Sequence, residues 1–162
     1  MKSMKRISFA VTVILTAVLP CVYSMAPVSE KPQQVKPSSP SMTVSQDVEE
    51  LIELLNTGSL AQKVHAEAEL SKLGKAARPA LKPLLSALES EEPPLRMGAA
   101  YTLGSIEDYS AVEPLIVSLD DSNSLVRVNA AWALENITGQ SLGQEKQAWQ
   151  DWWQKNKSKI EK

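Results

Sequence analysis

Leu95-Arg-Met-Gly-Ala-Ala-Tyr-Thr-Leu-Gly-Ser-Ile106 is followed thirty-one residues later by Val126-Arg-Val-Asn-Ala-Ala-Trp-Ala-Leu-Glu-Asn-Ile137. The two stretches share Arg, Ala, Leu and Ile at four equivalent places: Arg96 and Arg127, Ala99 and Ala130, Leu103 and Leu134, Ile106 and Ile137. A weaker copy upstream has Lys63, Ala66, Leu70 and Leu73 in these places. Self-similarity at such a period is typical of stacked-repeat proteins, so the sequence predicts a small solenoid.

Each copy is preceded by a second apolar segment at helical spacing. The three segments contain Val48, Leu51, Ile52 and Leu55, then Leu81, Leu84, Leu85 and Leu88, then Leu115, Ile116 and Leu119. Every copy therefore represents a pair of helices. We expect an all-α array of three pairs over residues 47–139, stacked at periods of thirty-three and thirty-one residues. About three repeats are needed for such an array to be stable.

Several residues predict where these helices begin and end. Asp47 with Glu50, Ser59 with Gln62, and Ser110 with Glu113 have capping-box spacing, and Gly74 is a helix stop. Pro83 and Pro114 fall in first turns, where the missing N–H is not needed. Residues 89–94 and 120–124 are predicted loops before the second helices at 95–106 and 126–137.

Residues 140–162 break the repeat and are predicted to form a C-terminal capping helix and tail. Trp149, Trp152 and Trp153 lie at i, i+3 and i+4, which places the three indoles on one stripe of a helix over residues 144–157. A terminal repeat exposes its stacking face unless a cap covers it. We interpret the three tryptophans as this structural cap, with ligand stacking as the alternative.

The N-terminus has the pattern of an export signal. Three basic residues precede a charge-free apolar run over residues 7–19, too short for the roughly 20 residues of a membrane-spanning helix. We expect a signal peptide over residues 1–24 and a Pro- and Ser-rich disordered spacer over residues 25–46. Lipidation at Cys21, the only cysteine, is the less favoured alternative because Pro20 precedes it, and only then would the chain associate with a membrane. The expected location is periplasmic or secreted.

Charge and residue content exclude several classes of function. Without residues 1–24 the chain has 14 basic and 19 acidic residues, a net charge of −5, which argues against nucleic acid as a partner. It then has no cysteine, so disulfides and thiol catalysis are excluded. His65 has no second histidine near it, and the acidic loop at 120–124 lacks the glycine and distal Glu of a calcium loop. We predict no metal, no cofactor and no catalytic residue, and we interpret the acidic loops as solvated.

The repeated residues resemble HEAT repeats of the short bacterial kind found in phycobilisome lyases. The Pro-Leu-Leu and Pro-Leu-Ile entries at 83–85 and 114–116 and the repeated Arg, Ala, Leu and Ile places carry this resemblance over about residues 47–157. It implies a HEAT-like α-solenoid in which Arg96 and Arg127 form a structural ladder by pairing with loop carboxylates or carbonyls. Lys63 stands in this place in the first repeat.

One face of the second helices is unexpectedly apolar. At about 100° per residue, Ala99, Leu103 and Ile106 point into the stack, and the opposite side is predicted to line the concave groove. We predict partner binding there, with Tyr101 and Trp132 as anchors, since exposed apolar patches and aromatic residues mark interaction sites. The predicted site residues are Met97, Tyr101, Val128, Trp132 and Asn136. The alternative is that the C-terminal helix or the spacer folds over this face.

Two classes of function therefore remain, and a small structural module of a larger envelope assembly, tethered by the spacer, is a third possibility. The first is a non-catalytic, exported scaffold that binds a protein or peptide on the concave face. The second is an accessory or lyase-type enzyme, which only the resemblance to phycobilin lyases suggests.

Export leads to a direct prediction. Cleavage after Ser24 should leave a mature protein whose N-terminus is near Met25. Intact-mass spectrometry of the protein from its native compartment checks this. An uncleaved Met1 in the cytosol, or a lipid on Cys21, would contradict it.

Overall fold

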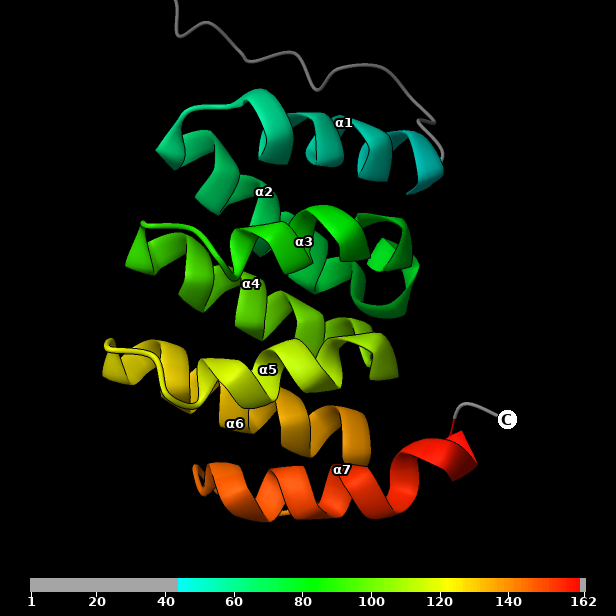
Figure 1. The fold of residues 1–162 in the computed structure, drawn as a ribbon. Helices are drawn as coiled ribbons and strands as arrows, with labels where there is room; N and C mark the ends of the chain where they lie inside the picture. The colour runs from blue at the N-terminus through cyan, green and yellow to red at the C-terminus, as the bar shows by residue number, and fades with distance from the viewer. Residues whose placement is uncertain (1–43, 161–162) are drawn as a thin grey trace, which may run out of the picture. The chain divides into compact units, whose positions relative to one another are not determined.

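The computed structural model describes residues 44–160 as a stack of helices, with no strand among them (Figure 1). The predicted signal peptide and most of the spacer lie outside this range. The helices are α1 (Val44–Thr57), α2 (Leu60–Leu73), η1 (Gly74–Ala80), α3 (Leu81–Ala87), α4 (Pro93–Ile106), η2 (Tyr109–Ala111), α5 (Val112–Ser118), α6 (Ser124–Thr138) and α7 (Lys146–Ile160).

Three helix pairs, α1 with α2, α3 with α4 and α5 with α6, follow one another along the stack (Figure 1). The second helices form its continuous spine, since α2 packs on α4 and α4 packs on α6. The expected all-α array of stacked helix pairs is thus confirmed.

The predicted apolar positions supply the core. Leu70, Leu84, Leu103 and Leu134 are fully buried, and burying a leucine contributes about 1.5–3 kcal/mol. The alanines repeated in the second helices, Ala66, Ala99 and Ala130, are also fully buried. Leu51, Ile52, Leu81 and Leu85 are only half-buried and pack against the edge of this core. The repeat period therefore reflects one continuous core.

Some helix boundaries follow the predicted signals. The backbone N–H of Ser59 donates to Gln62 Oε1 at 2.9 Å, which confirms the capping-box contact at the start of α2. Gly74 ends α2 with a φ of 53°, a backbone conformation that favours glycine.

Other boundaries differ from the prediction. Helix α1 begins at Val44, so Asp47 lies in its first turn instead of capping it. Pro93 and Pro94, predicted to be loop residues, are the first two residues of α4, where a proline costs no hydrogen bond. The predicted loop over residues 89–94 is therefore shorter than expected, and α4 starts two residues earlier.

The predicted cap of Ser110 with Glu113 is wrong. Asp108 caps this segment instead, because its Oδ1 accepts from the backbone N–H of Ser110 at 2.9 Å. The short helix η2 then delays the start of α5 to Val112. This places the Glu113 carboxylate against α7, where it accepts from Trp153 Nε1 at 2.9 Å.

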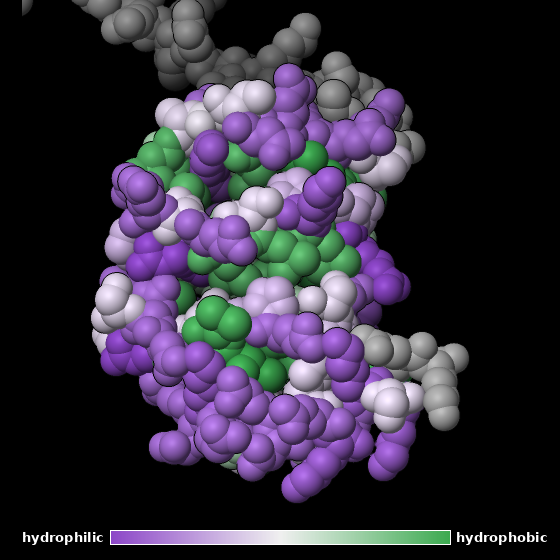
Figure 2. Space-filling model, in the orientation of Figure 1, coloured by the Kyte–Doolittle hydropathy of each residue, from purple (hydrophilic) through white to green (hydrophobic). Residues whose placement is uncertain are grey.

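The tryptophan stripe of α7 faces the array. Trp149 is fully buried and its Nε1 donates to the Gly143 carbonyl at 2.8 Å, while Trp153 is 7% exposed. Trp152 lies between them, half-buried. The surface over α7 at the end of the stack is largely hydrophilic in Figure 2, as expected of a terminal helix that covers an apolar end.

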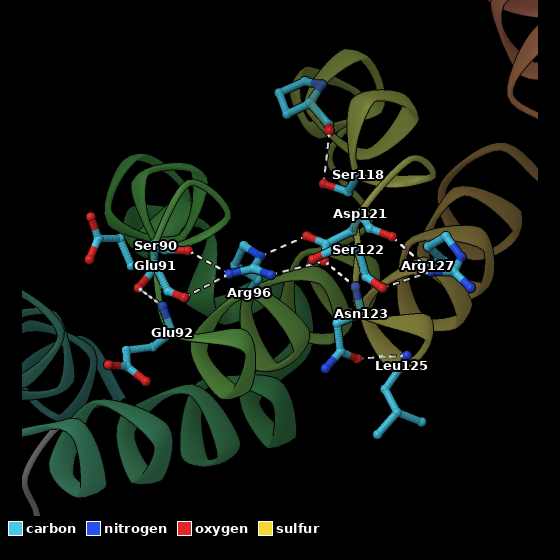
Figure 3. A network of polar contacts seen from close by, with 11 residues as sticks. Ser90, Glu91, Glu92, Arg96, Ser118, Asp121, Ser122, Asn123, Leu125 and Arg127 are labelled. Atoms are coloured by element: carbon cyan, nitrogen blue, oxygen red, sulfur yellow. Dashed lines mark hydrogen bonds and ion pairs between the residues drawn. The ribbon is translucent and has the colours of Figure 1, made fainter.

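Arg96 ties two successive loops together (Figure 3). Its Nε and Nη2 bind the two carboxylate oxygens of Asp121 at 2.6 and 2.9 Å, a bidentate geometry. Its Nη1 donates to the carbonyls of Ser90 and Glu91 at 2.8 and 3.1 Å. The loop before α4 and the loop before α6 are therefore held by one guanidinium group.

Arg127 repeats half of this arrangement. Its Nη1 donates to the carbonyls of Asp121 and Ser122 at 2.8 and 3.2 Å. These two residues precede Arg127 by six and five positions, and Ser90 and Glu91 precede Arg96 by the same numbers of positions. Asp121 is thus a structural residue, and our interpretation of it as part of a solvated loop is wrong. Its side chain is 11% exposed, and the hydrogen bond from Arg96 holds the pKa of this carboxyl below its usual range.

Candidate functional site

The second helices leave a row of apolar side chains exposed. Val64 on α2 is 37% exposed, Tyr101 on α4 is 44% exposed, and Leu125 and Val128 on α6 are 57% and 49% exposed. Two of these residues, Val64 and Tyr101, line a pocket of about 260 Å³, which we call the groove. It is lined by Val64, Glu67, Ala68, Ser71, Pro94, Met97, Gly98, Tyr101, Thr102 and Asn129.

Tyr101 and Trp132 form the aromatic part of this face. Their rings are stacked, with centroids 4.6 Å apart and planes 13° from parallel. The Trp132 ring also lies against Gly104, since a Cβ built on Gly104 would be 2.7 Å from Trp132 Cζ3. Trp132 is therefore half-buried and supports the more exposed ring of Tyr101.

The structure brings most of the predicted site residues to one side. Met97 and Tyr101 line the groove, and Val128 and Asn136 are exposed on α6. Leu125 and Asn129, which the sequence reasoning missed, belong to the same region. The C-terminal helix α7 packs on α5. The alternative in which this helix covers the apolar face of the second helices is therefore wrong. The spacer alternative falls outside residues 44–160.

A buried carboxyl group lies in the wall of the groove. The side chain of Glu67 on α2 is 1% exposed, and neither carboxylate oxygen has a hydrogen-bond partner. Buried polar groups in folded proteins almost always have a partner, so an unsatisfied one calls for a reason.

Gly98 on α4 makes the space for this carboxyl group. A Cβ on Gly98 would lie 2.1 Å from Glu67 Oε2, so any larger residue would displace the Glu67 side chain. The Thr102 hydroxyl has two main-chain carbonyls within reach of its one hydrogen, and it donates to those of Glu67 and Gly98 at 3.0 and 2.8 Å. The contact between α2 and α4 therefore has room for the Glu67 side chain only because residue 98 is a glycine.

The repeat register contains a signal for Glu67 that the sequence reasoning did not use. Thirty-three and then thirty-one residues further on, Ala100 and Ala131 occupy its place, and both are buried. A glutamate at this small, buried position departs from the repeat pattern, and burying its carboxyl group without a partner costs free energy.

Burial raises the pKa of Glu67 to about 8, against a smaller lowering effect of Lys63 one turn earlier on the same helix. The carboxyl group is thus mostly neutral at pH 7. Burial of this kind next to a pocket is typical of functional sites, although structural groups show it too.

A second pocket is larger than the groove but offers less chemistry. It measures about 630 Å³ and lies where η1, η2 and α7 meet. Its charged groups pair with one another, as Lys75 with Glu107, Arg78 with Asp108 and Lys157 with Glu113. Within residues 44–160 no three metal-ligating side chains come together, and no helix there is long and apolar enough to cross a membrane.

Comparison with known families agrees with this architecture. Residues 81–148 match the family model described as HEAT repeats, which covers α3 to the start of α7 and supports a HEAT-repeat protein. The resemblance to the bacterial lyase-like subtype is not tested by this match. None of the curated proteins matches the chain.

The buried glutamate predicts an unusual pH dependence of stability. The native state keeps the Glu67 proton after the unfolded chain has lost it at about pH 4.5, so the free energy of unfolding should fall as pH rises toward 8. The expected slope is on the order of 1.4 kcal/mol per pH unit. Glu67→Gln should remove this contribution, as measured by urea unfolding between pH 5 and pH 8.

Glu69→Gln is the matched control, because Glu69 is on the same helix and pairs at the surface with Lys72. This variant should keep the slope of the parent. A parent protein whose stability is unchanged from pH 5 to pH 8 would show that the carboxyl group is ionised in the native state.

Proposed function

We propose that this chain is a non-catalytic, exported interaction scaffold that binds a segment of a protein partner in the groove of its second helices. HEAT repeats generally mediate protein–protein interaction, which supports the scaffold. The observation that carries the proposal is the exposed Tyr101 ring, stacked on Trp132 at 4.6 Å beside an apolar pocket.

The aromatic pair suits this role because it is held in place before a partner arrives. Trp132 packs on Gly104 and on the core. Because Tyr101 stacks on this fixed ring, the two side chains have little conformational freedom left to lose on binding. Ordering interface side chains costs about 0.5–1.5 kcal/mol each, and a rigid aromatic anchor avoids much of this cost.

The other predicted residues have secondary roles in the proposal. Met97 and Val128 extend the apolar contact on either side of the pair, and Asn136 supplies a polar rim. Arg96 and Arg127 act at a distance, because they fix the loops from which α4 and α6 start. The tryptophans of α7 act as the cap.

Export through residues 1–24 is part of the proposal, with a periplasmic or secreted protein as its consequence. The lyase-type alternative makes a different prediction. A bilin-binding protein would carry visible absorbance when purified from its native cells, and the scaffold would not.

Photo-crosslinking tests the site. With p-benzoylphenylalanine at Tyr101 of the full-length protein, we expect a covalent product with one partner protein. The same group at Val117, which is 66% exposed on α5 outside the groove, should not yield it. Tyr101→Ala should then weaken binding of that purified partner by about thirtyfold, the effect of losing an interface anchor of about 2 kcal/mol.

The crosslinked peptides decide the outcome. Equal products from positions 101 and 117 would show that the groove is not the binding site. Products within this chain itself would show that the face is covered by its own residues or by a second copy.

A further inference from the structure

We propose that Glu67 sets the specificity of the groove by receiving a lysine side chain from a basic segment of the partner. This inference rests on the function proposed above and names the chemistry of the partner. It starts from the one buried polar side chain among residues 44–160 whose oxygens lack any hydrogen-bond donor.

Glu67 and the apolar side chains line one pocket, with the two carboxylate oxygens covered just behind its wall. Glu67 and Gly98 both line the groove, together with Val64, Met97 and Tyr101. A lysine side chain has the same division, since its four methylene groups pack on apolar surface while its ammonium group seeks a polar partner. The wall and the carboxyl group therefore match the two parts of one side chain.

A purely apolar occupant would gain nothing from Glu67, because it would leave the two oxygens as they are in the free protein, covered and without a donor. An ammonium group supplies the missing donors and a compensating charge.

Lysine fits better than arginine for a geometric reason. Glu67 Oε2 occupies the space where a Cβ of Gly98 would be, 2.1 Å from that position, so one oxygen is turned into the α2–α4 contact. A guanidinium group binds a carboxylate best through both oxygens, whereas an ammonium group is a compact point charge. Both oxygens are covered in the free protein, so a ligand has to displace part of the pocket wall to reach them, and a compact ammonium group needs less room for this than a planar guanidinium group.

Charge complementarity points to a basic partner as well. Residues 44–160 contain 11 Lys and Arg against 17 Asp and Glu, a net charge of −6. Such a balance attracts basic segments and speeds their association.

Binding should be coupled to loss of a proton from Glu67. Glu67 lines two pockets, and two other titratable residues line them with it: Lys63 on the same helix and Tyr101 on α4. The residues of α1, α3 and α6 that line these pockets carry no charge. Because the free carboxyl group is mostly neutral at pH 7, affinity for a lysine should increase as pH rises from 6 to 8.

A random peptide library displayed on phage, selected on the full-length protein, tests this inference. Peptides that depend on Tyr101 should be enriched in lysine. For one such synthetic peptide, replacing its lysine by norleucine should weaken binding about tenfold to a hundredfold, the value of a hydrogen bond to a charged group. On the Glu67→Gln protein, with helicity and melting checked, this replacement should have little effect, and the pH dependence of binding should disappear.

The outcomes separate the two proposals. Tyr101-dependent peptides without lysine enrichment, or a lysine effect that persists in Glu67→Gln, would overturn the role of Glu67 and leave the groove in place as the binding site. If no selected peptide depends on Tyr101, the proposed function fails and this inference fails with it. Selection of peptides equivalent to residues 25–46 would identify the chain's own predicted spacer as the occupant and would also overturn the proposal.

Discussion

The close approach of α4 and α6 over Gly104 is the packing constraint on which the rest of the structure depends. A Cβ on Gly104 would lie 2.7 Å from Ala133 Cα and 2.8 Å from Ala133 Cβ, so the two helix backbones meet with no room for a side chain. The buried alanines of the repeat continue this contact along the second helices. Trp132, which has no space inside such a contact, lies over Gly104 and stacks on Tyr101 at the surface.

One repeat earlier, a second glycine of α4 also lies at a close contact between two helices, but a side chain fills the space beside it. At the crossing of α2 and α4, the space that Gly98 leaves is filled by the Glu67 carboxyl group and not by backbone. The Arg96 guanidinium, bound to Asp121 and to two loop carbonyls, fixes the start of α4 relative to that of α6. Tyr101, Trp132 and the buried carboxyl group of Glu67 therefore all lie on the second helices, as the proposed preorganised binding site requires.

The sequence predicted the fold because period and apolar spacing are properties of the whole array. Counting angles along the helices also placed Tyr101 and Trp132 on one side, but the count contains no distances and did not predict that the rings stack. The Ser110 cap failed because Asp108, two residues earlier, competes for the same backbone N–H. A single glutamate in a helix is usually solvated, so Glu67 was not predicted to be buried, although the repeat register aligns it with the buried Ala100 and Ala131. Its lack of a hydrogen-bond partner is evident only from the structure.

The substitution Gly104→Ala tests the spine most directly, through the free energy of unfolding from urea denaturation. In an ordinary helix interior, replacing glycine by alanine stabilises by roughly 0.5–1 kcal/mol. At Gly104 the added methyl group would meet the Ala133 backbone at 2.7 Å, and we predict a destabilisation of about 1–3 kcal/mol, the usual cost of overpacking. An increase in stability would show that the contact between α4 and α6 can accommodate an additional methyl group, and it would contradict the account.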